Sequence, residues 1–186
     1  KTVYLTTPLY YVNASPHIGH SYTEVAADAL ARYHRLAGRG VFLLTGTDEH
    51  GQKIAQAAAA AGKPPQAFVD EVGERFKSLW KTLDIAYDDF IRTTEPRHVQ
   101  AVQQILTRLK DAGKLARAEY QGWYCPPDET FWTEAELVTH GISTTAPVCP
   151  TCQRALEPAK DEGWYLRLCA NQEWLRAFVA AHPDFV

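Results

Sequence analysis

The sequence predicts an α/β protein built on a parallel sheet, followed by a small cysteine-containing module. A β-branched and aromatic segment, Val3–Thr7, is followed by a segment with helical spacing and then by a continuous apolar run, Val41–Thr45. This order, with an apolar second strand, is typical of a parallel βαβ unit. After Lys114 the long helical patterns give way to short strand-like segments, paired prolines and a Cys-x-x-Cys pair, which indicates a separate module.

The first helix is expected between these two strands. Ser15 is a suitable N-cap, Pro16 suits the first helical position, and Gly38 would end the helix. Apolar residues recur at helical spacing in between: Tyr22, Val25, Ala26, Ala29, Leu30, Tyr33 and Leu36. After the second strand, the segment Gly46–Gly51 is expected to be a loop at the carboxyl edge of the sheet.

Further helices and one strand complete the first part. Helical spacing predicts helices over Gln52–Ala61, Pro65–Leu83 and Glu95–Ala112, and Asp89–Arg92 has the character of a short strand. In the cysteine module we expect four elements, two strands and two helices: Tyr120–Tyr124, Thr133–Val138, Trp164–Leu168 and Asn171–Ala181.

Composition limits the class of protein. The 186 residues are 46% hydrophobic, which is enough for one full core and a small second one. The net charge of −3 provides no general positive field, so any RNA contact would be local or outside this chain. No segment approaches the roughly 20 apolar residues of a membrane span, and the start lacks the features of a signal peptide. We therefore expect a cytoplasmic protein without a membrane partner.

Two smaller expectations concern single residue types. The chain contains no Met, including at position 1, and therefore does not begin at an unprocessed initiator. Cys169 lies in an apolar run, so we expect it to be a buried core thiol rather than a metal ligand.

His17, Gly19 and His20 are candidates for a phosphate site. In open α/β sheets the first strand-to-helix turn points backbone N–H groups at an anion. Two histidines three residues apart lie on one side of the first helical turn, so both imidazoles could donate to one phosphate chain. Gly19 would let a flat purine approach the backbone. A bare His-x-x-His is more often a pair of surface residues, and only its position after the first strand favours the ligand interpretation.

A second polar cluster, Asp48-Glu49-His50, lies between Gly46 and Gly51. It would lie at the same edge of the sheet, where Asp48 is placed to pair with a substrate ammonium and His50 could reach a nucleotide. Three ionisable residues in a loop are usually just solvated, but here they follow an apolar strand. Nucleotidyl transfer depends on positioned donors more than on a covalent nucleophile, so the chain needs no Ser-His-Asp arrangement for such chemistry.

Three segments together resemble the successive motifs of bacterial methionyl-tRNA synthetases: Thr6–Asn13 (TTPLYYVN), Pro16–His20 (PHIGH) and Thr45–Gly51 (TGTDEHG). Other class I synthetases share the HIGH tetrapeptide, but the flanking segments of the leucine, isoleucine, valine and cysteine enzymes differ. The resemblance implies a Rossmann-like parallel sheet of the class I synthetase type. Residues 1–114 would be the first half of the catalytic domain, and residues 115–186 a connective insertion with a zinc-knuckle-like module.

The resemblance also implies roles for individual residues. Five would bind ATP: Tyr11, Asn13, His17, Gly19 and His20. Of these, His17 and His20 would be catalytic. Leu9 and Tyr11 would line the methionine pocket, and Asp48 would bind the amino group. The implied reaction is attack of the methionine carboxylate on the α-phosphorus of ATP, accompanied by Mg²⁺, to give methionyl-adenylate, followed by transfer to tRNA(Met).

The second signature of the family, KMSKS, does not occur in this sequence. We therefore expect this chain to be inactive alone. An alternative is a non-catalytic, synthetase-like module that binds RNA or a partner protein. A small adenylyltransferase of the same superfamily is a third reading, but such proteins carry neither the Asp48-Glu49-His50 loop nor a cysteine module.

The cysteines suggest a zinc site. Cys149-Pro-Thr-Cys152 is a good zinc half-site, and Cys125-Pro-Pro-Asp128 has a carboxylate where a second sulfur would be expected. Zn²⁺ accepts carboxylate oxygen, so a Cys₃Asp site is chemically reasonable, with His140 as a substitute ligand at a poorer spacing. In the other interpretation Asp128 is a turn residue and the thiols are free or oxidised. The family resemblance also implies one or two zinc knuckles in the insertion.

Overall fold

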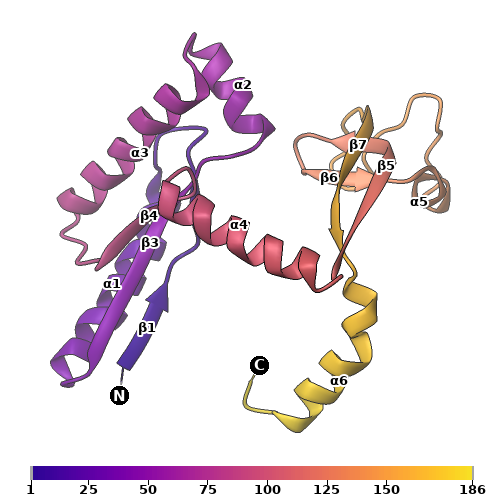
Figure 1. Cartoon of the computed structure of the whole chain (residues 1–186). Helices are drawn as coiled ribbons and strands as arrows, with labels where there is room; N and C mark the ends of the chain where they lie inside the picture. Colours follow the sequence, from indigo (N-terminus) through magenta and orange to yellow (C-terminus); the bar gives the residue numbers. More distant parts are fainter. Residues whose placement is uncertain (1, 186) are drawn as a thin grey trace. The chain divides into compact units, whose positions relative to one another are not determined.

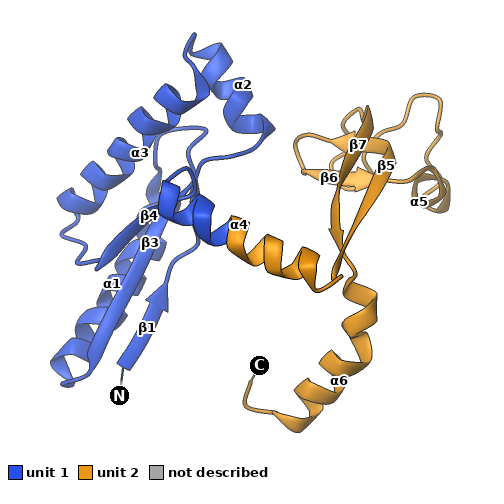
Figure 2. Cartoon of the chain, viewed as in Figure 1, with its two compact units in different colours: residues 1–102 blue, residues 103–186 orange. Residues whose placement is uncertain are grey.

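The computed structural model describes residues 2–185, and these form two compact units (Figure 2). Unit 1 comprises residues 1–102 and unit 2 residues 103–186, so the division falls within helix α4 (Pro96–Asp111). The domain boundary expected at residue 114 stays a prediction.

Unit 1 contains the predicted parallel sheet (Figure 1). Its central strand is β3 (Gly40–Asp48), which pairs in parallel with β1 (Thr2–Thr6), β2 (Tyr10–Tyr11) and β4 (Asp89–Arg92). The α/β fold class is confirmed. Strand β2 was not predicted because a two-residue strand carries no periodicity.

Three helices complete unit 1: α1 (Ile18–Leu36), α2 (Gln52–Ala60) and α3 (Pro65–Thr82). All three were predicted, with shifts of a few residues at their ends. Helix α3 supplies much of the hydrophobic core, and Phe76 and Trp80 of this helix are completely buried. Tyr10 of β2 belongs to the same core, and its ring packs against both of these side chains. The core therefore lies directly beneath the start of α1.

The start of α1 differs from the prediction. The N-cap is His17, in extended conformation (φ −128°, ψ 175°), and not Ser15. The imidazole of His17 accepts a backbone N–H as a hydroxyl would, so the cap moves two residues along the chain. The Ser15 hydroxyl instead accepts a hydrogen bond from Nη1 of Arg75 at 2.7 Å. Pro16 consequently lies outside the helix.

Strand β3 is longer than predicted and includes Gly46 to Asp48, which were expected in a loop. A Cβ atom at Gly46 would lie 2.0 Å from the carbonyl oxygen of Ile91 in the neighbouring strand. The glycine is therefore explained by the close approach of β4 and not by a turn.

Unit 2 contains the second part of α4, an antiparallel sheet with strand order β6-β5-β7, and two further α-helices. Its elements after α4 are β5 (Leu115–Cys125), β6 (Thr130–Trp132), α5 (Glu134–Thr139), β7 (Glu157–Leu166), the 3₁₀ helix η1 (Leu168–Asn171) and α6 (Gln172–Ala181). Both predicted strands are longer than expected, and the second ends at Leu166. A small core is formed by Cys125, Leu137, Cys149 and Leu156.

The prediction that Cys169 is buried is wrong. Cys169 is an exposed, free thiol within η1. The apolar run that suggested a buried strand ends in a 3₁₀ turn, in which consecutive side chains no longer alternate between two faces of a sheet.

Between residues 2 and 185, no helix combines the length and apolar character needed to cross a membrane.

Candidate functional site

A hollow of about 440 Å³ lies between strand β2 and the first turn of α1. Eight residues line it: Leu9, Tyr10, Tyr11, Asn13, Ala14, Ser15, His17 and His20. Five of them were predicted as site residues: Leu9 for methionine, Tyr11 for both ligands, and Asn13, His17 and His20 for ATP. The structure thus brings these five residues together, and their ligand roles stay predictions.

The two histidines form a stacked pair with ring centroids 3.8 Å apart. Nδ1 of His17 accepts the backbone N–H of Gly19, and Nδ1 of His20 accepts that of His17, each at 3.1 Å. A ring nitrogen that accepts a hydrogen bond carries no proton, so each neutral ring has its proton on Nε2. The Nε2–H groups are therefore the donors that these rings offer to an anion.

The ring of His20 also packs against the hydrophobic core of unit 1. Its ring packs edge-on against Tyr10 at 5.0 Å and against Phe76 at 5.2 Å. Burial lowers the pKa of His20, and the neighbouring His17 lowers it further. The ring is therefore neutral at pH 7, in the tautomer that donates through Nε2.

The structure explains the glycine at position 19 in a second way, besides the predicted approach of a purine. A Cβ atom at this position would lie 2.9 Å from Cε1 of His17, closer than such atoms approach in proteins. The glycine therefore makes room for the capping imidazole, whether or not a purine also approaches the backbone here.

Asp48 is the last residue of β3 and pairs in register with Tyr11 of β2. Along β3 the odd-numbered residues from Leu43 to Thr47 are buried, and Asp48 belongs to the alternate, more accessible set. It does not line the hollow described above. The structure places Asp48 beside Tyr11, which also belongs to the predicted methionine site.

Glu49 differs from the expectation of a solvated loop residue. It is 4% exposed and forms an ion pair with Arg92 of β4. In the structure Glu49 continues the alternation of buried residues along β3, but no local sequence pattern signals its contact with Arg92. His50 is exposed, and its Nε2 lies 3.3 Å from the carbonyl oxygen of Thr93.

Glu24 of α1 is a buried polar residue that the sequence did not indicate. It has no exposed surface, and the Thr45 hydroxyl donates a hydrogen bond to Oε1. The hydroxyl of Thr7 lies 2.9 Å from that of Thr45. Burial raises the pKa of Glu24 against the opposing effect of these hydrogen bonds, and burial and Glu24 together raise the pKa of the neighbouring Tyr10. The only sequence signal was two threonines at core-facing positions of adjacent strands.

In unit 2 the four predicted metal ligands converge. The sulfur and carboxylate oxygen atoms of Cys125, Asp128, Cys149 and Cys152 all lie within 4.8 Å of one another. The Sγ atoms of Cys125 and Cys152 are 3.5 Å apart, and Sγ of Cys149 lies 3.2 Å from Oδ2 of Asp128. Tetrahedral zinc, with bonds of about 2.0–2.3 Å, would place its ligands roughly 3.3–3.8 Å apart. These two distances are close to that range, while zinc binding itself stays a prediction.

The surroundings of this cluster are consistent with a metal site. Cys125 and Cys149 are completely buried, and burial raises the pKa of the Cys125 thiol to about 12, so a cation is needed to hold it as a thiolate. The alternative ligand His140 instead packs edge-on against Trp132, at 5.6 Å, and does not belong to the cluster.

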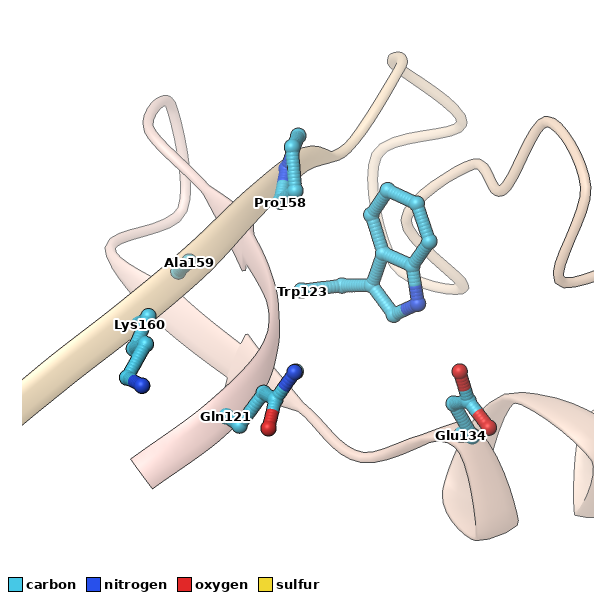
Figure 3. A pocket seen from close by; sticks show the side chains of 7 residues that line it. Gln121, Trp123, Glu134, Pro158, Ala159 and Lys160 are labelled. Carbon is cyan, nitrogen blue, oxygen red and sulfur yellow. The ribbon is translucent and has the colours of Figure 1, made fainter. Parts of the chain in front are cut away.

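Unit 2 also has an open hollow of about 620 Å³, beside the indole of Trp123 (Figure 3). Gln121, Glu134 and Lys160 contribute polar groups to its walls. None of the predicted site residues lines this hollow, and the cysteine cluster is not part of it.

A parallel βαβ unit with a His-x-x-His pair at the start of its first helix agrees with the class that the sequence resembles, the class I aminoacyl-tRNA synthetases. The model of the family described as "tRNA synthetases class I (M)" matches residues 3–176. The chain belongs to this family, the methionyl-tRNA synthetases. The family prediction is therefore confirmed.

Two bacterial proteins named methionine–tRNA ligase illustrate the likeness. The Thermotoga maritima protein is 49% identical over 183 residues, which are 98% of this chain and 29% of that protein. The Caldanaerobacter subterraneus protein is 50% identical over 186 residues, covering all of this chain and 28% of that protein. The chain thus spans less than a third of the length of these relatives.

Solved structures of a methionyl-tRNA synthetase are similar to this chain. The Mycobacterium tuberculosis methionyl-tRNA synthetase in complex with methionyl-adenylate has a TM-score of 0.87 and 38% identity, covering all of this chain and 36% of that one. The apo form of the same enzyme has a TM-score of 0.68.

Proposed function

We propose that the protein carrying this chain activates methionine with ATP and transfers the methionyl group to tRNA(Met). The observation that supports this most directly is the hollow beside His17 and His20. Both rings are held in the tautomer that donates through Nε2, and residues from two sequence motifs, Thr6–Asn13 and Pro16–His20, line the hollow.

In the proposed reaction a methionine carboxylate oxygen attacks the α-phosphorus of ATP, and pyrophosphate leaves. Negative charge spreads over the phosphate oxygens in the transition state, where preorganised N–H donors stabilise it most. The Nε2–H groups of His17 and His20 would supply such donors. Asp48 would hold the ammonium of methionine, while Leu9 and Tyr11 contribute apolar walls.

Two metals belong to this proposal. Mg²⁺ would accompany ATP and neutralise its phosphates. Zinc would have a structural role, joining the Cys125–Asp128 turn to the Cys149–Cys152 turn in unit 2.

The proposal is tested by methionine-dependent ATP–pyrophosphate exchange, measured on the longest natural protein that contains this chain. We expect exchange in the unmodified protein and its loss in His20→Ala and in Asp48→Ala. His34→Ala is the matched control, because His34 lies on the same helix but outside the hollow.

The alternative, a non-catalytic module that binds RNA or a partner, gives the opposite result. Robust RNA binding without ATP, together with no exchange in the unmodified protein, would overturn the proposed activity. Exchange that persists in His20→Ala would instead reject the role assigned to this ring.

A further inference from the structure

We propose that Glu49 and Arg92 are positioning residues, whose buried ion pair fixes the segment that presents Asp48 and His50 to the substrates. This inference rests on the proposed function and extends it to two side chains that do not line the hollow beside the histidines.

The Glu49 carboxylate is enclosed by donors on both oxygens. Oε1 accepts from Nε of Arg92 and from the Thr47 hydroxyl, each at 2.7 Å. Oε2 accepts from Nη2 of Arg92 at 3.0 Å and from the Thr94 hydroxyl. The side chain of Glu49 has no exposed surface. A carboxylate with this many charge-assisted bonds has one orientation only.

Arg92 is fixed in turn by a second acid. Its Nη2 donates to Oδ1 of Asp70 on α3 at 2.6 Å, and 17% of its side chain is exposed. The hydrogen bonds that Arg92 donates to Glu49, and then those to Asp70, raise its pKa against the effect of burial. A planar guanidinium that bridges two carboxylates ties the end of β3 to both β4 and α3.

The backbone around Glu49 is fixed as well. Its N–H donates to the Thr93 hydroxyl at 2.9 Å, and Nε2 of the next residue, His50, lies 3.3 Å from the Thr93 carbonyl oxygen. Because side chains alternate along a strand, anchoring Glu49 on the buried side directs Asp48 to the opposite side. Asp48 there neighbours Tyr11 in the register of β2 and β3.

The buried Glu49–Arg92 ion pair costs desolvation free energy, which suggests that it has a functional role. Burying two charges is expensive, and a well-packed apolar pair would often be equally stable. Such a pair would leave the end of β3 without directional bonds. We attribute the ion pair to the need to place a neighbouring carboxylate within a fraction of an ångström.

The test is a kinetic comparison of Glu49→Gln with the unmodified full-length protein. Gln keeps the shape but removes the charge, so we expect the KM for methionine to rise about tenfold, with a smaller change in kcat. Thr94→Val, a milder change, removes a single bond to Oε2 and should raise the KM in the same direction. Glu74→Gln is the matched control, since it breaks an exposed ion pair with Lys77 on α3, away from the hollow.

Two further measurements distinguish a loss of Asp48 positioning from a general loss of folded structure. In an Asp48→Asn background, Glu49→Gln should add little to the KM for methionine, because it acts through Asp48. Amide hydrogen exchange at residues 48–50 should accelerate in Glu49→Gln while the exchange of α1 amides stays unchanged. The amide measurement does not depend on catalysis, so it is informative even if the protein shows no exchange of pyrophosphate.

An unchanged KM for methionine in both Glu49→Gln and Thr94→Val would overturn the inference while leaving the proposed function intact. Unchanged amide protection at residues 48–50 would overturn it independently of activity. Absence of pyrophosphate exchange in the unmodified protein would overturn the proposed function instead.

Discussion

His17 and His20 are joined by a hydrogen bond from the backbone N–H of the first to the ring of the second, and their imidazoles stack. The same two rings cap helix α1, since His17 also accepts the N–H of Gly19. One set of contacts therefore both starts the helix and selects the tautomer of each ring. This dual role leads to a prediction about Gly19.

Replacing Gly19 with Ala should reduce activity with little net change in stability. Alanine is the better helix former, by about 1 kcal/mol. Its Cβ, however, would lie 2.9 Å from Cε1 of His17 and must displace that ring. We expect pyrophosphate exchange to fall at least about tenfold, because a positioned donor is misplaced. The midpoint of thermal unfolding should change little, because the gain in helix propensity offsets the weakened His17 cap.

Ser21→Ala is the control for this experiment, because it also improves helix propensity in the first turns of α1 but does not line the hollow. Its activity should stay near that of the unmodified protein. Equal activity in Gly19→Ala and Ser21→Ala would show that the His17 ring tolerates the added methyl group.

Glu24 predicts a pH dependence of stability. Burial raises its pKa in the folded state above the ordinary value of 4.5. A carboxyl group with a raised folded pKa contributes stability that is fully present below its unfolded pKa and is lost as the pH rises through the folded pKa. Glu24→Gln cannot ionise, so the free energy of unfolding of the unmodified protein should fall relative to that of the variant as the pH rises.

Denaturant titrations from about pH 4.5 to pH 8 measure this difference. Glu134→Gln, at an exposed position, is the control and should show no comparable trend. A pH-independent difference between Glu24→Gln and the unmodified protein would mean that Glu24 keeps an ordinary pKa despite its burial.

Much of the fold could be predicted from periodicity alone. The three helices of unit 1 and its strands β1, β3 and β4 follow from apolar spacing, which local patterns record well. The residues of the candidate site were also identifiable, because Leu9, Tyr11 and the two histidines occur in short motifs close together in the sequence. They converge on one hollow because β2 and the first turn of α1 are joined by only a short segment at the carboxyl end of β1.

What sequence reasoning missed depends on contacts between distant segments. Glu49 was expected in the loop after the second strand, and its burial was missed because its partner Arg92 is 43 residues away and nothing local indicates the pairing. The cap at His17 was missed because imidazole is an unusual capping group, whereas Ser15 is a common one. Glu24 occupies a helical position that propensity treats as exposed, and only the hydroxyl groups of Thr7 and Thr45 show that it faces the sheet.

Zinc binding in unit 2 is open to a direct test. We expect one zinc per chain by elemental analysis, bound by three thiolates and Asp128. Asp128→Ala should lower the zinc content and the thermal stability, whereas Asp128→Cys, which restores the commoner four-sulfur site, should keep both. Chelation should destabilise the unmodified protein by removing a cross-link between two turns.

The control for the zinc experiment is His140→Ala, because His140 lies outside the cluster of four ligand atoms. Its zinc content should equal that of the unmodified protein. A loss of zinc in His140→Ala with none in Asp128→Ala would reverse the assignment of the fourth ligand.

Gly46 and Gly40 offer a comparison within a single strand. A Cβ at Gly46 would lie 2.0 Å from the Ile91 carbonyl oxygen, whereas one at Gly40 would meet only Oγ1 of Thr2, at 3.7 Å. Gly46→Ala must push β4 away from β3, and overpacking of this kind costs about 1–3 kcal/mol or more. Gly40→Ala should be neutral or slightly stabilising, since it restricts the unfolded chain. Because β4 ends in Arg92, the shift in Gly46→Ala should also loosen the Glu49 ion pair and raise the KM for methionine.

Chemical denaturation of both variants measures the difference in stability, and pyrophosphate exchange measures the change in KM. Equal stability of the two variants would contradict the close approach of β4 at Gly46.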